Sequence, residues 1–139
     1  MSKEIGENFV AALRELEESR NVEKIASLYA ENAEIGNVVA PKKFIGRDGA
    51  RDFWTKYRET FSEISSEFRN KIHTENQSAL EWTTTGKSNG EKDIIYSGVT
   101  ILEIENGKIS RSCAYFNSEN LGKQIQGDAP PKENQAVSA

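Results

Sequence analysis

The sequence contains a single cysteine, Cys113, and a single histidine, His73, among its 139 residues. One cysteine excludes a disulfide within the chain, and one cysteine with one histidine cannot supply the three or four ligands of a zinc site. A metal site would therefore need a cluster of carboxylates, for which the sequence has no motif. We predict no metal and no cofactor.

The sequence also lacks any apolar run near the ~18 residues of a membrane-spanning helix. Its start, MSKEIGENF, lacks the positively charged segment followed by an apolar run that a secretion signal would have. The formal net charge of -4 gives no general attraction to phosphate backbones or anionic membranes. We therefore expect a cytoplasmic protein with no nucleic acid and no membrane among its partners.

The first half of the chain has the spacing of three amphipathic helices. Apolar residues recur every three or four positions from residue 5 to residue 16, and the polar side of that helix is assigned Glu15, Glu17 and Glu18. Asn21 is predicted to cap a second helix and Asp48 a third, which carries the aromatic row Phe53, Trp54, Tyr57 and Phe61. Between the second and third helices, LYAENAEI predicts a short strand.

The second half predicts four antiparallel strands. The first has Ile64, Phe68 and Ile72 on even positions, and three more follow through about residue 116. Asn-Gly pairs at 89–90 and 106–107 mark the turns between the last three, and a left-handed glycine in each would close a three-residue hairpin loop. Such loops pair even positions with even, so the even-numbered side chains share the inner face of the sheet.

Two pairs follow from those loops. Trp82 is expected opposite Tyr96, and Thr100 opposite Ser112. Helices followed by a meander predict an α+β fold, with a curved antiparallel sheet packed against three N-terminal helices as a cone. Residues 1–125 are predicted to form one domain. Residues 126–139, which hold two of the three prolines and almost no large apolar residue, are predicted to be a mobile C-terminal tail.

Three segments in this order carry a family resemblance: FVAALRELEESRNVEKIASLYAENAEI, GRDGARDFW and GVTILEIENGKISRSCAYFN. Over about residues 5 to 125 the chain resembles the nuclear transport factor 2-like superfamily, of cystatin-like fold, in its SnoaL-like and ketosteroid isomerase-like branch. The resemblance implies a cone with a cavity. Members include isomerases, epoxide hydrolases, polyketide cyclases, dehydratases and pure binding modules, so the fold leaves the activity open.

The acids of these enzymes are absent from the matching positions. The resemblance to ketosteroid isomerases puts Phe9, Asn37 and Thr100 where those enzymes have a tyrosine and two aspartates, and neither a phenyl ring nor an amide can move a carbon-bound proton. The resemblance to limonene epoxide hydrolases puts Trp82, Thr84 and Ala114 where an Asp-Arg-Asp set belongs, Ile35 where a tyrosine belongs, and keeps only Asn37. The acid usual in SnoaL-type cyclases is Asn117 here. Glu34 and Glu81 are the nearest acidic candidates.

The cavity is therefore predicted to be neutral, apolar and lined with hydroxyls. Its candidate catalytic residues are Asn37, Tyr96 and Thr100, and its candidate ligand-binding residues are Phe9, Trp54, Tyr57, Trp82, Thr84, Leu102, Ser112, Ala114 and Phe116. A filled core is the alternative for the aromatic residues, and a turn cap in GNVVAP is the alternative for Asn37. His73 and Cys113 are expected to face outward, His73 as a surface residue and Cys113 as a packing residue.

Two functions remain open. The cone can bind a small, mainly apolar, oxygenated molecule such as a polyketide, terpenoid or steroid-like ketone and promote its cyclisation, isomerisation or dehydration. Alternatively, the protein is a non-catalytic ligand carrier or a dimerising interaction module, because the family acids are missing. The outer sheet face is expected to form a homodimer, since it would otherwise expose an apolar patch of Val99, Ile101, Cys113 and Tyr115.

Overall fold

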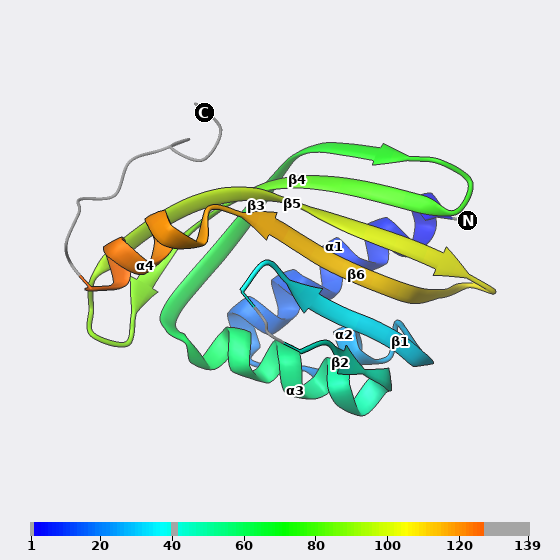
Figure 1. The fold of residues 1–139 in the computed structure, drawn as a ribbon, viewed down its shortest axis with the longest axis horizontal. Helices are drawn as coiled ribbons and strands as arrows, with labels where there is room; N and C mark the ends of the chain where they lie inside the picture. The colour runs from blue at the N-terminus through cyan, green and yellow to red at the C-terminus, as the bar shows by residue number, and fades with distance from the viewer. Residues whose placement is uncertain (1, 40–41, 127–139) are drawn as a thin grey trace.

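The structure, a computed structural model, describes residues 2–39 and 42–126 (Figure 1). The helices are α1 (Ser2–Ser19), α2 (Glu23–Ala26), α3 (Gly46–Glu59) and α4 (Ser118–Gln126). The strands are β1 (Tyr29–Asn37), β2 (Phe44–Ile45), β3 (Phe61–His73), β4 (Gln77–Ser88), β5 (Asp93–Glu105) and β6 (Lys108–Phe116). Among the described residues, no helix is long and apolar enough to cross a membrane.

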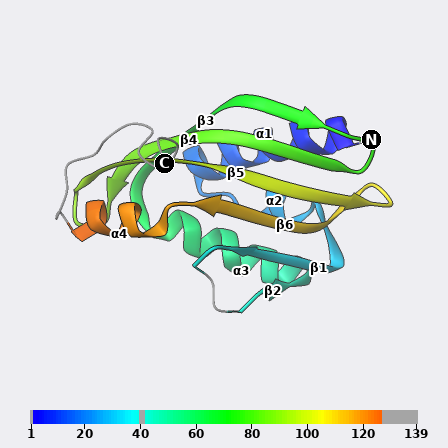
Figure 2. The same ribbon diagram turned by 45° about the horizontal axis from the view of Figure 1, so that its top comes forward.

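The strands form one sheet in the order β2-β1-β6-β5-β4-β3. β3 to β6 make the predicted antiparallel meander, and the α+β class with a curved sheet over the helices is confirmed. The sheet is mixed, however, because β1 pairs with β6 in parallel. Figure 2 shows β5 and β6 running above α3, with α1 behind β4 and β5. α1 packs mainly on β3 and α3 on β1, so the two helices close the concave side of the sheet.

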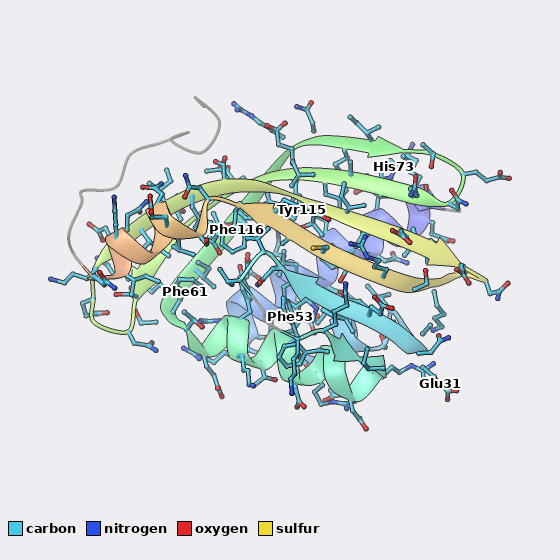
Figure 3. All side chains as sticks on the ribbon, viewed as in Figure 1. Glu31, Phe53, Phe61, His73, Tyr115 and Phe116 are labelled. Carbon is cyan, nitrogen blue, oxygen red and sulfur yellow. The ribbon has the colours of Figure 1, made fainter. Side chains whose placement is uncertain are left out.

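Two bulges bend β3. Ser62 and Arg69 have no partner in the register with β4, so each is an extra residue on β3. A bulge turns the following side chains to the opposite face. Ile72 is therefore exposed, contrary to the even-position pattern, and the expectation that His73 faces outward is wrong. Its Nδ1 lies 2.7 Å from Ser78 Oγ in a half-buried contact, at the end of the sheet beside the start of α1 (Figure 3).

The β4–β5 turn lies one residue later than predicted. Ser88 and Lys92 close it through a backbone hydrogen bond of 2.9 Å, and the left-handed residue is Glu91, at φ 63°, instead of Gly90. The loop still has three residues, so even positions still pair with even. The register nevertheless moves by two, which places Trp82 opposite Gly98 and Tyr96 opposite Thr84.

The β5–β6 turn differs in another way. Asn106 and Gly107, at φ 52° and 77°, form a two-residue turn of the I′ kind. Ser110 then adds a bulge to β6, which restores the even-to-even pairing that a two-residue turn alone would break. Thr100 consequently pairs with Ala114 instead of Ser112. The predicted inner face is confirmed, since Trp82 and Leu102 are buried while Glu81 and Glu103 are half-exposed.

The ends of the elements correct three further expectations. The N-cap of α2 is Val22, so the prediction of Asn21 as the cap is wrong, although Asn21 Oδ1 accepts the Glu23 backbone N–H at 3.0 Å beside it. Asp48 lies inside the first turn of α3, whose N-cap is Ile45, and binds Arg51 at 2.6 Å instead of capping the helix. α4 was not predicted, and it includes residue 126 of the expected tail; residues 127–139 lie outside the described residues.

Candidate functional site

A cavity of about 70 Å³ lies between the helices and the inner face of the sheet, and we call it the inner cavity. It is framed by α1, α3 and every strand except β2. Its lining is aromatic and small-polar, and consists of Leu13, Gly36, Asn37, Phe53, Trp54, Tyr57, Ser66, Trp82, Thr84, Tyr96, Thr100, Ser112, Cys113, Ala114 and Phe116. Alone, this volume holds a few water molecules.

A larger hollow of about 330 Å³, the outer mouth, adjoins it. The two share five lining residues, Asn37, Phe53, Tyr57, Tyr96 and Phe116. α4, which the sequence did not predict, contributes Leu121 to the outer mouth. Figure 3 labels three of its aromatic side chains, Phe53, Phe61 and Phe116, which come from α3, β3 and β6. A ligand larger than a few atoms would extend from the inner cavity into this mouth.

Most of the predicted site residues line the inner cavity, but Phe9 and Leu102 do not. Phe9 is 1% exposed and packs edge-on against Trp54 with ring centroids 5.8 Å apart. Leu102 is fully buried in the same core cluster. Both side chains occupy the space between helix and sheet, so the structure places them in the packed core instead of at a ligand surface.

Several lining residues were missed by the sequence analysis: Leu13, Gly36, Phe53, Ser66 and Cys113. Gly36 and Cys113 are register partners in the parallel β1–β6 pair, whose pairing no local pattern predicted. A Cβ added at Gly36 would meet no atom within 4 Å, so the glycine leaves open space at this edge of the cavity. Cys113 was expected on the outer face alone, and its place beside Gly36 makes it part of the lining.

Asn37 fits both readings that the sequence left open. Its Oδ1 accepts the Val39 backbone N–H at 2.9 Å, which is the turn role, and the residue also lines the inner cavity and the outer mouth. The two acidic candidates lie elsewhere. Glu34 is paired with Lys43 at 3.6 Å, and Glu81 accepts a hydrogen bond from Asn70 at 2.6 Å. Neither lines the inner cavity.

The indole and phenol groups are held by buried hydrogen bonds. Trp82 Nε1 donates to Thr100 Oγ1 at 2.9 Å. Trp54 Nε1 donates to Tyr29 Oη at 3.2 Å, which in turn lies 2.8 Å from Ser112 Oγ. Burial raises the pKa of Tyr29 to about 12. These contacts fix the rings of the cavity wall in single orientations.

Tyr96 differs from the other polar residues of the wall. Its ring packs edge-on against Trp82 and Phe116 at 5.2 and 5.3 Å, and the residue is buried. Among the described residues, no group hydrogen-bonds to its hydroxyl. Burial, and secondarily the charge of Glu17, raise the pKa of Tyr96 well above its ordinary value. The phenol therefore stays protonated and remains a hydrogen-bond donor available to a ligand.

A buried carboxylate that the sequence analysis assigned to the polar side of α1 lies directly behind the cavity wall. Glu17 is 6% exposed. Its Oε1 accepts the Ser66 backbone N–H at 2.9 Å, and its Oε2 accepts the hydroxyls of Tyr57 at 2.8 Å and Ser66 at 2.6 Å. The Ser66 Oγ also lies 2.7 Å from Thr84 Oγ1. Tyr57, Ser66 and Thr84 all line the inner cavity.

One signal in the sequence could have located Glu17. It follows Leu13 by four positions, which places it on the apolar stripe of α1. Its partners, however, come from α3 and β3, and only the tertiary structure brings them together. No group of three or more His, Cys, Asp or Glu side chains among the described residues is arranged to hold a metal ion.

Comparisons with known proteins bear on family and fold. The model of the SnoaL-like domain family matches residues 7–112. TerC, crystallised with polyporic acid, superposes with a TM-score of 0.75 at 15% identity, covering 88% of this chain and 98% of TerC. An NTF2-like protein from Anabaena variabilis superposes with a TM-score of 0.76 at 15% identity, covering 86% of this chain and 91% of that protein. A proposed SnoaL-like polyketide cyclase from Shewanella denitrificans superposes with a TM-score of 0.72 at 16% identity, covering 90% of this chain and 96% of that protein. No curated protein matches.

Proposed function

We propose that this chain, which belongs to the family of SnoaL-like domains, binds a small, mainly apolar, oxygen-bearing molecule in the inner cavity and outer mouth. Aromatic rings from α3, β4, β5 and β6 supply the apolar contact surface. TerC, of similar fold, was crystallised with a small organic molecule, polyporic acid. That likeness supports a small organic ligand for this chain.

The observation that carries the proposal is the hydroxyl of the buried residue Tyr96, which lines both the inner cavity and the outer mouth, is protonated and has no hydrogen-bond partner among the described residues. Thr100 adds a second donor, because its Oγ1 accepts from Trp82 while its own proton has no acceptor among the described residues. Two hydroxyl donors on an apolar surface suit a ketone or similar oxygen acceptor.

Replacing Tyr96 with phenylalanine should weaken the binding of acetophenone, used here as a simple apolar ketone, by about tenfold. The variant keeps the ring contacts and removes only the donor, and one buried hydrogen bond contributes roughly 1 to 2 kcal/mol. Titration calorimetry measures the affinity, and Tyr115→Phe on the outer face is the matched control. Equal affinities for wild type and Tyr96→Phe would show that the Tyr96 hydroxyl does not hold the ligand.

The choice between a cyclase, isomerase or dehydratase and a non-catalytic carrier depends on a proton-transfer group in the cavity. The family acids expected there are replaced by neutral residues. We therefore propose ligand binding as the function, with carriage of the ligand as its non-catalytic form.

We also propose a homodimer through the outer sheet face. Tyr115 is 46% exposed there, beside the half-buried Val99, Ile101 and Cys113. Tyr115→Arg should convert the dimer to a monomer, because it places a charge in the apolar patch next to Arg111. Analytical ultracentrifugation at tens of micromolar measures both species. A wild-type chain that sediments only as a monomer of 15.5 kDa would contradict the dimer.

A further inference from the structure

The hydroxyls around Glu17 have a fixed direction of donation when the carboxylate is ionised. Tyr57 and Ser66 carry one hydroxyl proton each, and both donate it to Glu17 Oε2. Since the Ser66 proton is engaged, Ser66 Oγ can only accept from Thr84, 2.7 Å away. All three hydroxyls line the inner cavity. Toward a ligand they therefore present lone pairs only.

The donors lie on another part of the wall. Tyr96 and Thr100, both on β5, have hydroxyl protons with no acceptor among the described residues. The inner cavity thus combines a wall that accepts, backed by Glu17, with a wall that donates. A ligand that satisfies both carries a hydroxyl for the first and an oxygen acceptor for the second. Phenols and enols have both properties in one group, and their hydroxyl is acidic.

We propose that Glu17 is the acid–base group of the inner cavity and takes the proton of a bound phenol or enol through Thr84 and Ser66. The ligand O–H bond breaks as a proton moves to Thr84 Oγ1, the Thr84 proton moves to Ser66 Oγ, and the Ser66 proton moves to Glu17 Oε2. The ligand oxygen keeps the electron pair and becomes an anion, which Tyr96 and Thr100 stabilise. Glu17 becomes neutral, so the net charge of ligand and wall is unchanged.

The distances favour this route. Ser66 Oγ lies 2.6 Å from the carboxylate on one side and 2.7 Å from Thr84 on the other, so each hydroxyl can receive and pass on a proton. Tyr57 Oη donates to Glu17 Oε2 at 2.8 Å. Burial raises its pKa well above the ordinary value, with smaller contributions from Tyr96 and Glu17. Tyr57 therefore holds its proton and serves as a positioning residue for the carboxylate.

Glu17 also borders a surface groove of about 210 Å³, through which its proton can exchange with water. Ser66 lines both this groove and the inner cavity. Arg58, from α3, donates through Nε to the Glu17 backbone carbonyl at 3.1 Å and not to its carboxylate. The titratable and charged side chains around Glu17 are Arg14 and Glu18 on α1, Tyr57 and Arg58 on α3, Glu63 on β3 and Tyr96 on β5.

The test uses 4-nitrophenol, whose neutral and ionised forms absorb at different wavelengths. With the full chain in excess, the spectrum of the bound probe is recorded against pH. We expect the midpoint pH for ionisation of the bound probe to be lower in the wild type than in Glu17→Gln by one unit or more. One unit is about a tenfold change in the ionisation constant of the probe. The proton lost by the probe stays on Glu17. Binding at a pH where the free probe is neutral and the bound probe is ionised should therefore release no proton to the buffer, which calorimetry in buffers of different ionisation enthalpy measures.

Two further variants test the route and keep the test valid if Glu17→Gln fails to fold. Ser66→Ala and Thr84→Val interrupt the chain of hydroxyls while leaving the carboxylate in place, so in both the bound probe should ionise after a rapid pH jump at less than the wild-type rate. Glu81→Gln, which removes a hydrogen-bonded carboxylate from the outer face, should keep it. Circular dichroism checks that each variant is folded.

The outcomes separate this inference from the binding function on which it rests. Binding of 4-nitrophenol with the same rate of ionisation in the wild type, Ser66→Ala and Thr84→Val overturns the relay and leaves the binding function standing. Absence of any binding of phenols and ketones to the wild type overturns both. A shift that is lost in Glu17→Gln, together with an ionisation rate that falls in the Ser66 and Thr84 variants and is kept in Glu81→Gln, supports the assignment of Glu17.

Discussion

The free energy of unfolding is expected to fall steeply as the pH rises from 10 to 12, because Tyr29, Tyr57 and Tyr96 are held as neutral phenols in the fold. Burial is the largest cause in each case, and it raises the pKa of Tyr29 from 10.0 to about 12. Below the pKa of the unfolded chain, these phenols are protonated in both states and their contribution is fully present. Above it, the unfolded chain loses protons that the folded chain keeps, so stability is lost as the pH rises through the folded pKa.

The size of the loss in unfolding free energy follows from the difference between the folded and unfolded pKa values of each phenol. Each pKa unit corresponds to about 1.4 kcal/mol, so Tyr29 alone accounts for roughly 3 kcal/mol, and the other two phenols act in the same direction. Urea unfolding at several pH values from about 9 to about 12 measures the loss. Tyr29→Phe should give a shallower decline than the wild type over this window. Identical slopes for the two proteins would contradict the assignment of a buried, titrating Tyr29.

Gly98→Ala is expected to lower the free energy of unfolding by at least about 3 kcal/mol, at the upper end of the usual cost of overpacking. A Cβ at this position would lie 2.3 Å from the Tyr115 backbone oxygen and 2.8 Å from Trp82 Cζ2. The carbonyl belongs to the β5–β6 pair and cannot move without breaking the ladder. The Trp82 ring is fixed by its hydrogen bond to Thr100 and by Tyr96. Relief at either contact therefore disturbs the sheet or the cavity wall.

Gly36→Ala is the matched control for this prediction, because Gly36 also lies in a strand and an added Cβ would meet no atom within 4 Å. Its stability should stay close to that of the wild type. Chemical denaturation of the two variants in parallel provides the measurement. A Gly98→Ala protein as stable as Gly36→Ala would mean that Trp82 does not lie over β5 as described.

The inner face of the sheet was predictable from the sequence, although the pairings were not. Loop parity decides which side chains face the helices, and the displaced β4–β5 turn kept that parity. At the β5–β6 turn, a two-residue loop and the bulge at Ser110 offset each other. Local residues therefore identified Trp82, Thr84, Tyr96 and Thr100 as inward-facing, while the exact partners depended on backbone dihedral angles at Glu91 and Asn106.

The parts of the site that the sequence did not reveal depend on contacts between distant segments. The parallel β1–β6 pair brings Gly36 to Cys113, and it has no turn or spacing that would predict it. Glu17 was assigned to the polar side of α1 with Glu15 and Glu18, as expected of a residue type that is rarely buried. Its burial is explained by three donor groups from α3 and β3. A charged residue on an apolar helical stripe is therefore better treated as a candidate for internal hydrogen bonding than as an exception.

The bulge at Arg69 has a consequence for the whole molecule in solution. β3 is the long outermost strand of the sheet, so its unpaired backbone groups could recruit a strand from another chain. Extra residues at Ser62 and Arg69 break the regular spacing of those groups. Exposed charged side chains, among them Glu63, Glu67 and Lys71, are also spaced along the same strand. The irregularity that turns His73 inward therefore also protects this border of the sheet against edge-to-edge aggregation.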